Sequence, residues 1–125
     1  MGEDRQHLIL VVEDEFLIRE LMAVALADAG FATAQAESAI EALQLMRKVS
    51  VDGLVTDIDL GGGPTGWDLA QFARELTRSM PVVYVTGASG AQWGARGVSN
   101  STLLEKPFAV EEVVDSMQRL LTTRH

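Results

Sequence analysis

The segment VDGLVTDIDL, residues 51–60, decides how this chain folds. Its apolar residues predict a short buried strand that ends at the carboxylate of Asp57. Three glycines and a proline follow at 61–64, which predicts an open turn above the acid. Ligands bind at the carboxyl ends of strands in open α/β sheets, so this acid stands where a ligand site is expected.

Short apolar runs alternate with helical stripes on both sides of this segment. Further strands are predicted at 8–12, 31–35, 82–86 and 101–104. Helices are predicted at about 15–29, after residue 38, through 69–76, in a short piece ending near 93, and at 110–121. The strands are too closely spaced for anything but parallel crossovers. The order therefore predicts an α/β fold, a doubly wound sheet of five parallel strands with five helices.

Local signals mark several helix ends. Gly30 is placed to end the first helix. Ser38 and Glu41 form a capping-box pattern, in which each side chain accepts a hydrogen bond from a free amide at the helix start. Ser89 is a candidate cap for the fourth helix. Three glycines, at 90, 94 and 97, weaken that helix.

Composition narrows the class of protein. The chain has 125 residues, 47% of them hydrophobic, which suits one domain with a real core. It has no cysteine, no membrane-spanning run and no signal-like N-terminus, so we expect a cytoplasmic protein without membrane contact. The net charge of −8 argues against nucleic-acid binding. The basic residues are scattered and are expected on solvated helix surfaces: Arg19, Arg47, Lys48, Arg74, Arg78, Arg96 and Arg119.

Reactive side chains follow four of the predicted strands. Glu13 and Asp14 come after the first strand, Asp57 ends the third, Thr86 ends the fourth, and Lys106 follows the fifth. In a parallel sheet these ends share one edge, so the side chains are expected in one crevice. No glycine-rich phosphate loop follows the first strand, which argues against a nucleotide site.

Three carboxylates brought close together repel and raise one another's pKa. A hard divalent cation such as Mg²⁺, which prefers oxygen ligands, resolves this repulsion. An aspartate beside such an ion can act as a nucleophile toward phosphorus and form an aspartyl phosphate. Lys106 would then pair with phosphoryl oxygens, and Thr86 would donate a hydrogen bond to one.

With these residues the chain resembles the receiver domain of bacterial two-component response regulators. The matching marks are the acidic pair at 13–14, Asp57 after an apolar strand, Thr86 before a glycine, and Lys106-Pro107-Phe108. The resemblance runs from residue 8 to residue 121. We expect residues 1–125 to form a single receiver domain without an effector domain.

The resemblance implies a flavodoxin-like sheet in the order 2-1-3-4-5. It implies that Asp57 accepts a phosphoryl group from a histidine kinase or a histidine phosphotransfer protein. The chain would catalyse only its own phosphoryl transfer and dephosphorylation, and would otherwise not be an enzyme. The resemblance also implies that Asp14 and Asp57 ligate Mg²⁺ directly, that Glu13 acts through water, and that the Asp59 backbone carbonyl is a further ligand. Lys106 would contact the phosphoryl group, and the Thr86 hydroxyl would move on activation. Gly87 and Ala88 would flank the phosphoryl pocket, and the peptide before Pro107 would be cis.

The chain departs from the receiver pattern in three places. Leu103 stands where many receivers carry a Tyr or Phe, three residues before the lysine. The loop after Asp57 is glycine-rich and about one residue longer than usual. The glycine-rich fourth helix predicts a mobile segment at 87–98 and a switch that orders it. We expect output to a protein partner through the surface from the fourth to the fifth helix, from a monomer or weak homodimer.

Two alternatives remain at this point. Leu103 allows a degenerate receiver that folds but is never phosphorylated and acts as an interaction module. The pair Asp57 and Asp59 resembles the nucleophile motif of haloacid-dehalogenase-like phosphatases. That motif normally follows the first strand, however, and carries Thr or Val where Leu60 stands here.

Overall fold

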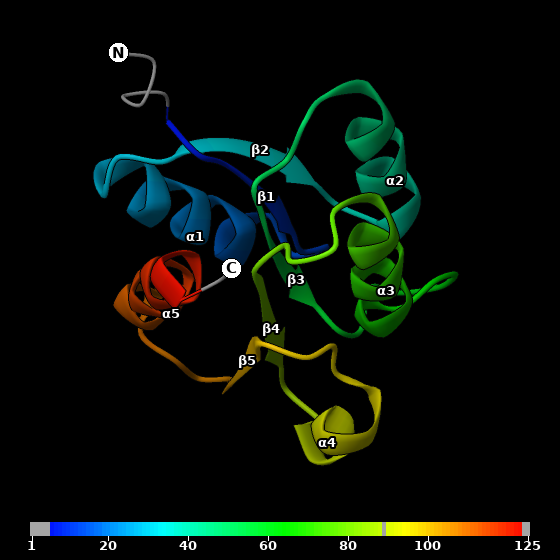
Figure 1. The fold of residues 1–125 in the computed structure, drawn as a ribbon. Coiled ribbons are helices and arrows are strands. Elements are labelled where there is room, and N and C mark those ends of the chain that lie inside the picture. The colour runs from blue at the N-terminus through cyan, green and yellow to red at the C-terminus, as the bar shows by residue number, and fades with distance from the viewer. Residues whose placement is uncertain (1–5, 89, 124–125) are drawn as a thin grey trace.

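A computed structural model, which describes residues 6–88 and 90–123, shows five strands and five helices (Figure 1). The strands are β1 (Leu8–Val12), β2 (Ala32–Ala36), β3 (Gly53–Asp57), β4 (Val82–Thr86) and β5 (Ser101–Glu105). The helices are α1 (Phe16–Asp28), α2 (Ala39–Lys48), α3 (Gly66–Leu76), α4 (Trp93–Arg96) and α5 (Val110–Thr123), and a 3₁₀ turn, η2 (Gly90–Gln92), precedes α4. Except for α4, these bounds lie close to those that hydrophobic periodicity predicted.

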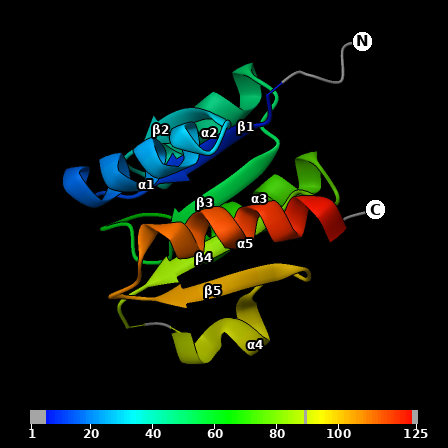
Figure 2. The ribbon, with the colours of Figure 1, turned by 90° about the vertical axis from the view of Figure 1, so that its left-hand side faces the viewer.

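All strand pairs are parallel, and the sheet order is β2-β1-β3-β4-β5, which confirms the flavodoxin-like prediction. Helices α1 and α5 cover one face of the sheet, and α2 and α3 cover the other (Figures 1 and 2). Helix α4 lies beside the β5 edge (Figure 2). Within the part of the chain that the structure describes, no helix is both long enough and apolar enough to cross a lipid bilayer.

The inner strands are buried on both faces, so successive side chains enter different cores. In β1, Ile9 and Val11 pack in the core under α1 and α5, whereas Leu10 and Val12 pack in the core under α2 and α3. Strands β3 and β4 have no exposed residue at all. The three central strands are therefore fixed in position, and so are the side chains at their carboxyl ends.

The helix starts differ in part from the predictions. Ser38 caps α2 as expected, because its Oγ accepts a hydrogen bond from the Glu41 amide at 3.1 Å. The reciprocal bond of a capping box is absent there, since Glu41 accepts from the amide of Glu37 rather than that of Ser38. A complete capping box occurs instead at α3, between Thr65 and Asp68, where the sequence analysis had not placed one.

The fourth helix was predicted too early in the chain. The α-helical turn begins at Trp93, where the predicted helix was to end, and Ser89 lies outside the described residues. Contacts from other elements hold this segment. The Tyr84 hydroxyl accepts a hydrogen bond from the Val98 amide at 3.1 Å, and the Trp93 indole donates to Ser101 Oγ at 3.0 Å. Its expected mobility and its role in a switch stay predictions.

We expect Tyr84→Phe to lower the free energy of unfolding by about 1 kcal/mol. Phe keeps the ring that packs on Trp67, whose centroid lies 4.8 Å away, but it leaves the Val98 amide without its acceptor. Urea denaturation followed by circular dichroism measures the loss. Amide exchange at Val98 should speed up more than exchange in β1. An unchanged unfolding midpoint would show that the hydroxyl contributes nothing.

Candidate functional site

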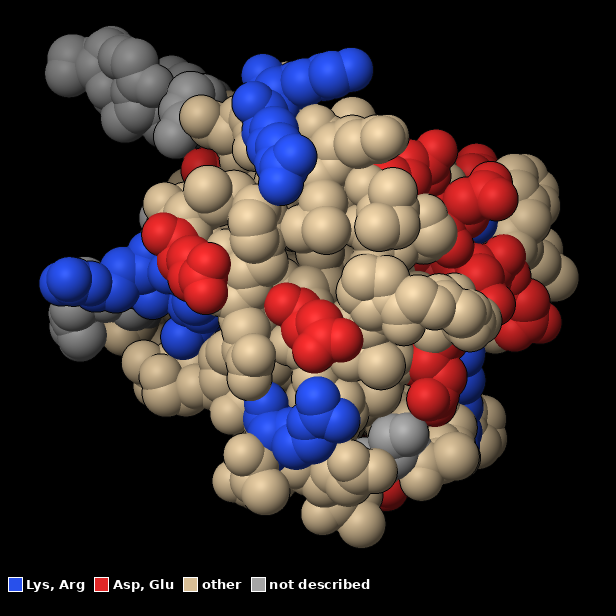
Figure 3. All heavy atoms as spheres, turned by 90° about the vertical axis from the view of Figure 1, so that its right-hand side faces the viewer, with Lys and Arg blue, Asp and Glu red and all other residues tan. Residues whose placement is uncertain are grey.

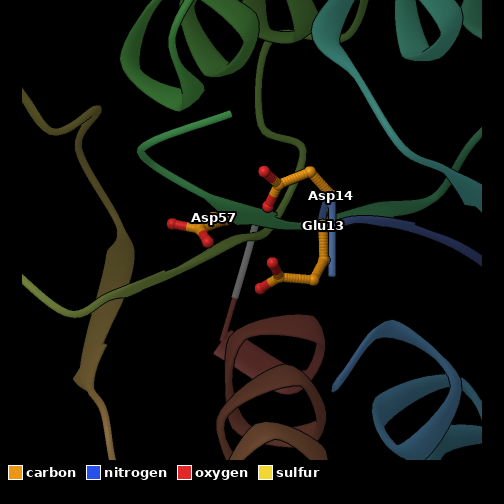
Figure 4. Close-up of side chains that lie close together, drawn as sticks. All are labelled: Glu13, Asp14 and Asp57. Atoms are coloured by element: carbon orange, nitrogen blue, oxygen red, sulfur yellow. The ribbon is translucent and has the colours of Figure 1, made fainter. Parts of the chain in front are cut away.

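Three carboxylates meet at the carboxyl ends of β1 and β3. Glu13 and Asp14 follow β1, and Asp57 is the last residue of β3. One oxygen from each lies within 4.8 Å of the other two, and Figure 4 shows the three side chains converging from two neighbouring strands. The parallel pairing of β1 with β3 produces this meeting, because it brings both strand ends to the same edge.

Lys106 reaches the same place from the loop between β5 and α5. Its Nζ donates hydrogen bonds to Asp57 Oδ2 at 3.0 Å and to Glu13 Oε1 at 3.2 Å. The peptide before Pro107 is cis, as the resemblance implied. The structure thus brings together the three acids and the lysine that the sequence analysis singled out, across up to 93 positions of the chain.

Burial decides the electrostatics of Glu13. The residue has no solvent exposure. Burial raises its pKa to about 7, and the negative charge of Asp57 pushes in the same direction, while the hydrogen bond from the Glu15 amide and the charge of Lys106 oppose the shift. Burial alone would lower the pKa of Lys106, but its hydrogen bond and ion pair with Asp57 and the charge of Glu13 raise it above its ordinary value. The ammonium group therefore stays charged beside the acids.

The glycine loop after β3 folds close over the acids. Gly61 and Gly63 have φ values of +89° and +79°, which favour glycine. A Cβ on Gly61 would lie 3.9 Å from Asp14 Oδ2. Gly66 is more restricted still, because a Cβ there would overlap the backbone carbonyl of Asp57, and its amide donates to the Ile58 carbonyl at 2.8 Å. The start of α3 is thus seated directly on the backbone of the acid.

The other predicted site residues lie at or just after the carboxyl ends of β3 and β4. Thr86 is fully buried, and its hydroxyl accepts a hydrogen bond from the Ala88 amide at 3.1 Å. Gly87 lies beside the stem of Lys106, since a Cβ on this glycine would be 4.0 Å from Lys106 Cδ. The Asp59 amide donates to Asp57 Oδ1 at 3.1 Å, but its side chain is exposed and is not in the carboxylate group found among the described residues. The Asp59 carbonyl stays a predicted ligand.

A cation that contacts the backbone of Glu13 was not predicted from the sequence. Arg19 was expected on a solvated surface, yet it is half-buried and its Nη1 donates to the Glu13 carbonyl oxygen at 2.7 Å. Its Nε also donates to Gln35 of β2 at 3.1 Å. Position 19 lies one turn into α1, where a long side chain can reach back to the end of β1. That spacing was the available signal.

The donor set fits a hard cation. All three side chains offer carboxylate oxygens, two of them from buried residues, and such oxygens are the ligands that Mg²⁺ and Ca²⁺ prefer. Figure 3 shows that further acidic side chains gather along one edge of the face formed by α2 and α3. A field of this sign attracts cations. Chemically, the group offers a carboxylate nucleophile, a place for a divalent ion and a fixed ammonium group.

Comparisons with known proteins agree on one family. The family model described as "Response regulator receiver domain" matches residues 9–118. A crystal structure of a response regulator receiver protein from Sinorhizobium medicae WSM419 is similar, with 34% sequence identity, a TM-score of 0.93, and coverage of 97% of this chain and 98% of that one. The receiver domain of NtrX from Brucella abortus has 31% identity and a TM-score of 0.80, with 92% and 98% of the two chains covered.

Curated relatives are longer proteins. The chain is 31% identical over 116 residues to the phosphate regulon transcriptional regulatory protein PhoB of Escherichia coli K12, an alignment that covers 90% of this chain and 51% of PhoB. It is 29% identical over 115 residues to the probable transcriptional regulatory protein SilR of Salmonella typhimurium, again with 50% of the relative covered. The chain therefore spans about half the length of these relatives.

Proposed function

Because this chain belongs to the family of response regulator receiver domains, we propose that it is a phosphoacceptor switch of a two-component phosphorelay, with Asp57 as the acceptor. One observation carries the proposal. Asp57 is the last residue of a buried strand, and its carboxylate lies beside two further acids and 3.0 Å from the ammonium group of Lys106. The family is also distinct from the dehalogenase-like phosphatases considered as an alternative.

The proposed reaction is phosphoryl transfer to an Asp57 carboxylate oxygen. A new O–P bond forms while the P–N bond to a phosphohistidine imidazole of the donor protein breaks. The imidazole nitrogen keeps the electron pair of that bond and takes a proton from water. The position of Asp57 supports this role, because its backbone is fixed by β3 pairing on both sides and by the Gly66 contact. A fixed nucleophile meets the donor with little reorganisation.

We propose Mg²⁺ as the ion held by Asp14 and Asp57, with Glu13 beside it. When bound, Mg²⁺ neutralises negative charge on the phosphoryl group and on the acids around it. The fully buried Glu13 supports the assignment of an indirect role, since its Oε1 accepts from Lys106 and its Oε2 accepts from the Glu15 amide. Both of its oxygens are thus already engaged in hydrogen bonds.

Lys106 and Thr86 would receive the transferred group. We propose that Lys106 exchanges its hydrogen bond with Asp57 for one with a phosphoryl oxygen, which keeps its charge paired throughout. Thr86 ends the strand next to β3, so rotation of its side chain would bring its hydroxyl toward the acceptor. Gly87 and Ala88 carry little side-chain bulk, so water would reach the phosphoryl group beside them.

The proposed partners follow from the family. The donor would be a histidine kinase or a histidine phosphotransfer protein. Output would pass to a protein partner through the surface from α4 to α5, which carries the half-exposed Trp93. We propose a monomer or weak homodimer in the free state.

The proposal is tested by incubating the purified chain with acetyl phosphate, with Mg²⁺ or with excess chelator, and recording intact mass. We expect the mass of one phosphoryl group to appear only with Mg²⁺, because the ion offsets the repulsion between the donor and the three acids. Hydroxylamine should remove the added mass, since it cleaves acyl phosphates. Absence of any mass gain with Mg²⁺ would contradict the proposal and favour the degenerate receiver.

A further inference from the structure

We propose that Arg19 is a positioning residue of the ion site, which it serves by holding the peptide between Glu13 and Asp14. This inference rests on the proposed function, because it assumes that the acids bind Mg²⁺. The key contact is the hydrogen bond from Arg19 Nη1 to the Glu13 carbonyl oxygen, at 2.7 Å. That carbonyl belongs to the same peptide unit as the amide of Asp14, so the contact fixes the direction from which the Asp14 side chain leaves the backbone.

The chain needs such a contact at this point. Strand β1 ends at Val12, and the Glu13 amide still bonds to the Ala36 carbonyl at 3.1 Å. Beyond Glu13 the ladder stops, and α1 begins only at Phe16. Asp14 therefore stands in a short turn outside regular structure. Within this turn the Glu15 amide donates to Glu13 Oε2 at 3.1 Å. Arg19 binds the Glu13 carbonyl and so restrains the peptide that leads to Asp14.

Arg19 is itself held on three sides. Its Nε donates to Gln35 Oε1 at 3.1 Å, and the Gln35 amide group donates to Glu20 at 3.2 Å. Its guanidinium lies over the ring of Phe16, 5.5 Å from the centroid. A side chain bound to β2 and to its own helix keeps its position. Arg19 therefore links the turn that carries Asp14 to two rigid elements.

Charge and position predict opposite effects, and this makes the proposal testable. Arg19 is positively charged close to a cation site, so its charge alone opposes Mg²⁺ binding, and removing it would tighten binding. If Arg19 positions Asp14, removing it weakens binding instead. Loss of an outer hydrogen bond that positions a metal ligand commonly costs affinity by about tenfold or more.

We expect Arg19→Ala to weaken Mg²⁺ binding about tenfold in isothermal titration calorimetry. Arg19→Lys keeps the charge and one donor, and it should recover most of the affinity. Gln35→Ala leaves every charge in place and removes the lateral support of Arg19 together with the hydrogen bond from Gln35 to Glu20, so it should weaken binding in the same direction but less. Arg119→Ala, at the far end of α5, is the matched loss of one positive charge and should not weaken binding.

Unfolding in the absence of Mg²⁺ shows whether each variant is folded, and the rise in unfolding midpoint on adding Mg²⁺ gives a second measure of binding. Arg19→Ala that binds Mg²⁺ as tightly as wild type, or more tightly, would overturn the inference. Should Arg19→Ala fail to fold, the charge-conserving Gln35→Ala decides, and unchanged affinity in it would overturn the inference. Wild-type protein that binds no Mg²⁺ would instead defeat the proposed function.

Discussion

Replacing Asp57 with Asn is expected to abolish phosphoryl uptake and most of the stabilisation by Mg²⁺, while the fold stays intact. Asn has the size of Asp and keeps a carbonyl oxygen that can accept the hydrogen bond from Lys106. It lacks the anionic oxygen that would attack phosphorus, and it removes one of three clustered charges. Intact mass after treatment with acetyl phosphate measures the first effect, and thermal unfolding measures the second.

The size of the second effect follows from mass action. At a Mg²⁺ concentration about 100 times the wild-type Kd, binding stabilises the wild type by about 2.7 kcal/mol, and a variant that has lost a ligand gains much less. Asp28→Asn is the matched control, because Asp28 is an exposed acid at the opposite end of α1. Equal phosphoryl uptake by wild type and Asp57→Asn would mean that another acid is the acceptor.

Gly66→Ala is expected to destabilise the protein by about 3 kcal/mol, a large effect for one methyl group. The added Cβ would overlap the Asp57 carbonyl and crowd the backbone of Ile58. Backbone in a central strand cannot move aside as a flexible side chain can, so the start of α3 would have to shift. Because the overlap falls on Asp57 itself, Mg²⁺ binding should weaken as well. Urea denaturation and calorimetry measure the two effects.

Gly62→Ala separates this clash from a general effect of glycine replacement. Gly62 lies in the same loop, but a Cβ there meets nothing within 4 Å and its φ is not positive. We expect its stability to stay within about 1 kcal/mol of wild type, or to rise slightly because the unfolded chain loses freedom. A Gly66→Ala variant as stable as Gly62→Ala would show that α3 is not seated on Asp57 as described.

Sequence patterns were sufficient to predict the sheet and most of the acid group. Continuous apolar runs at 8–12 and 82–85 are typical of strands covered on both faces, and both form inner strands. Once the strands are parallel, their carboxyl ends share an edge. The meeting of Glu13 with Lys106, 93 positions apart, is then a matter of topology rather than of detailed contacts.

Features that depend on side chains from distant segments could not be predicted in this way. The segment 90–98 is bonded to the Tyr84 hydroxyl through the Val98 amide and to Ser101 through the Trp93 indole, and the glycines of the segment itself do not predict these contacts. Arg19 has the same periodicity as a solvated residue, and its spacing from β1 shows that it can reach the strand end but not that it binds Gln35 and the Glu13 carbonyl. Local pattern cannot distinguish a supporting cation from a surface one.

The two tryptophans give the protein a pair of built-in optical reporters. Trp67 directly follows Gly66 and is only 1% exposed, so its fluorescence should be emitted at short wavelength and should respond to changes at the phosphoacceptor. Trp93 is 38% exposed, so it should emit at longer wavelength and be quenched by iodide. Spectra of the unlabelled chain can therefore follow the reaction centre and the α4 surface separately.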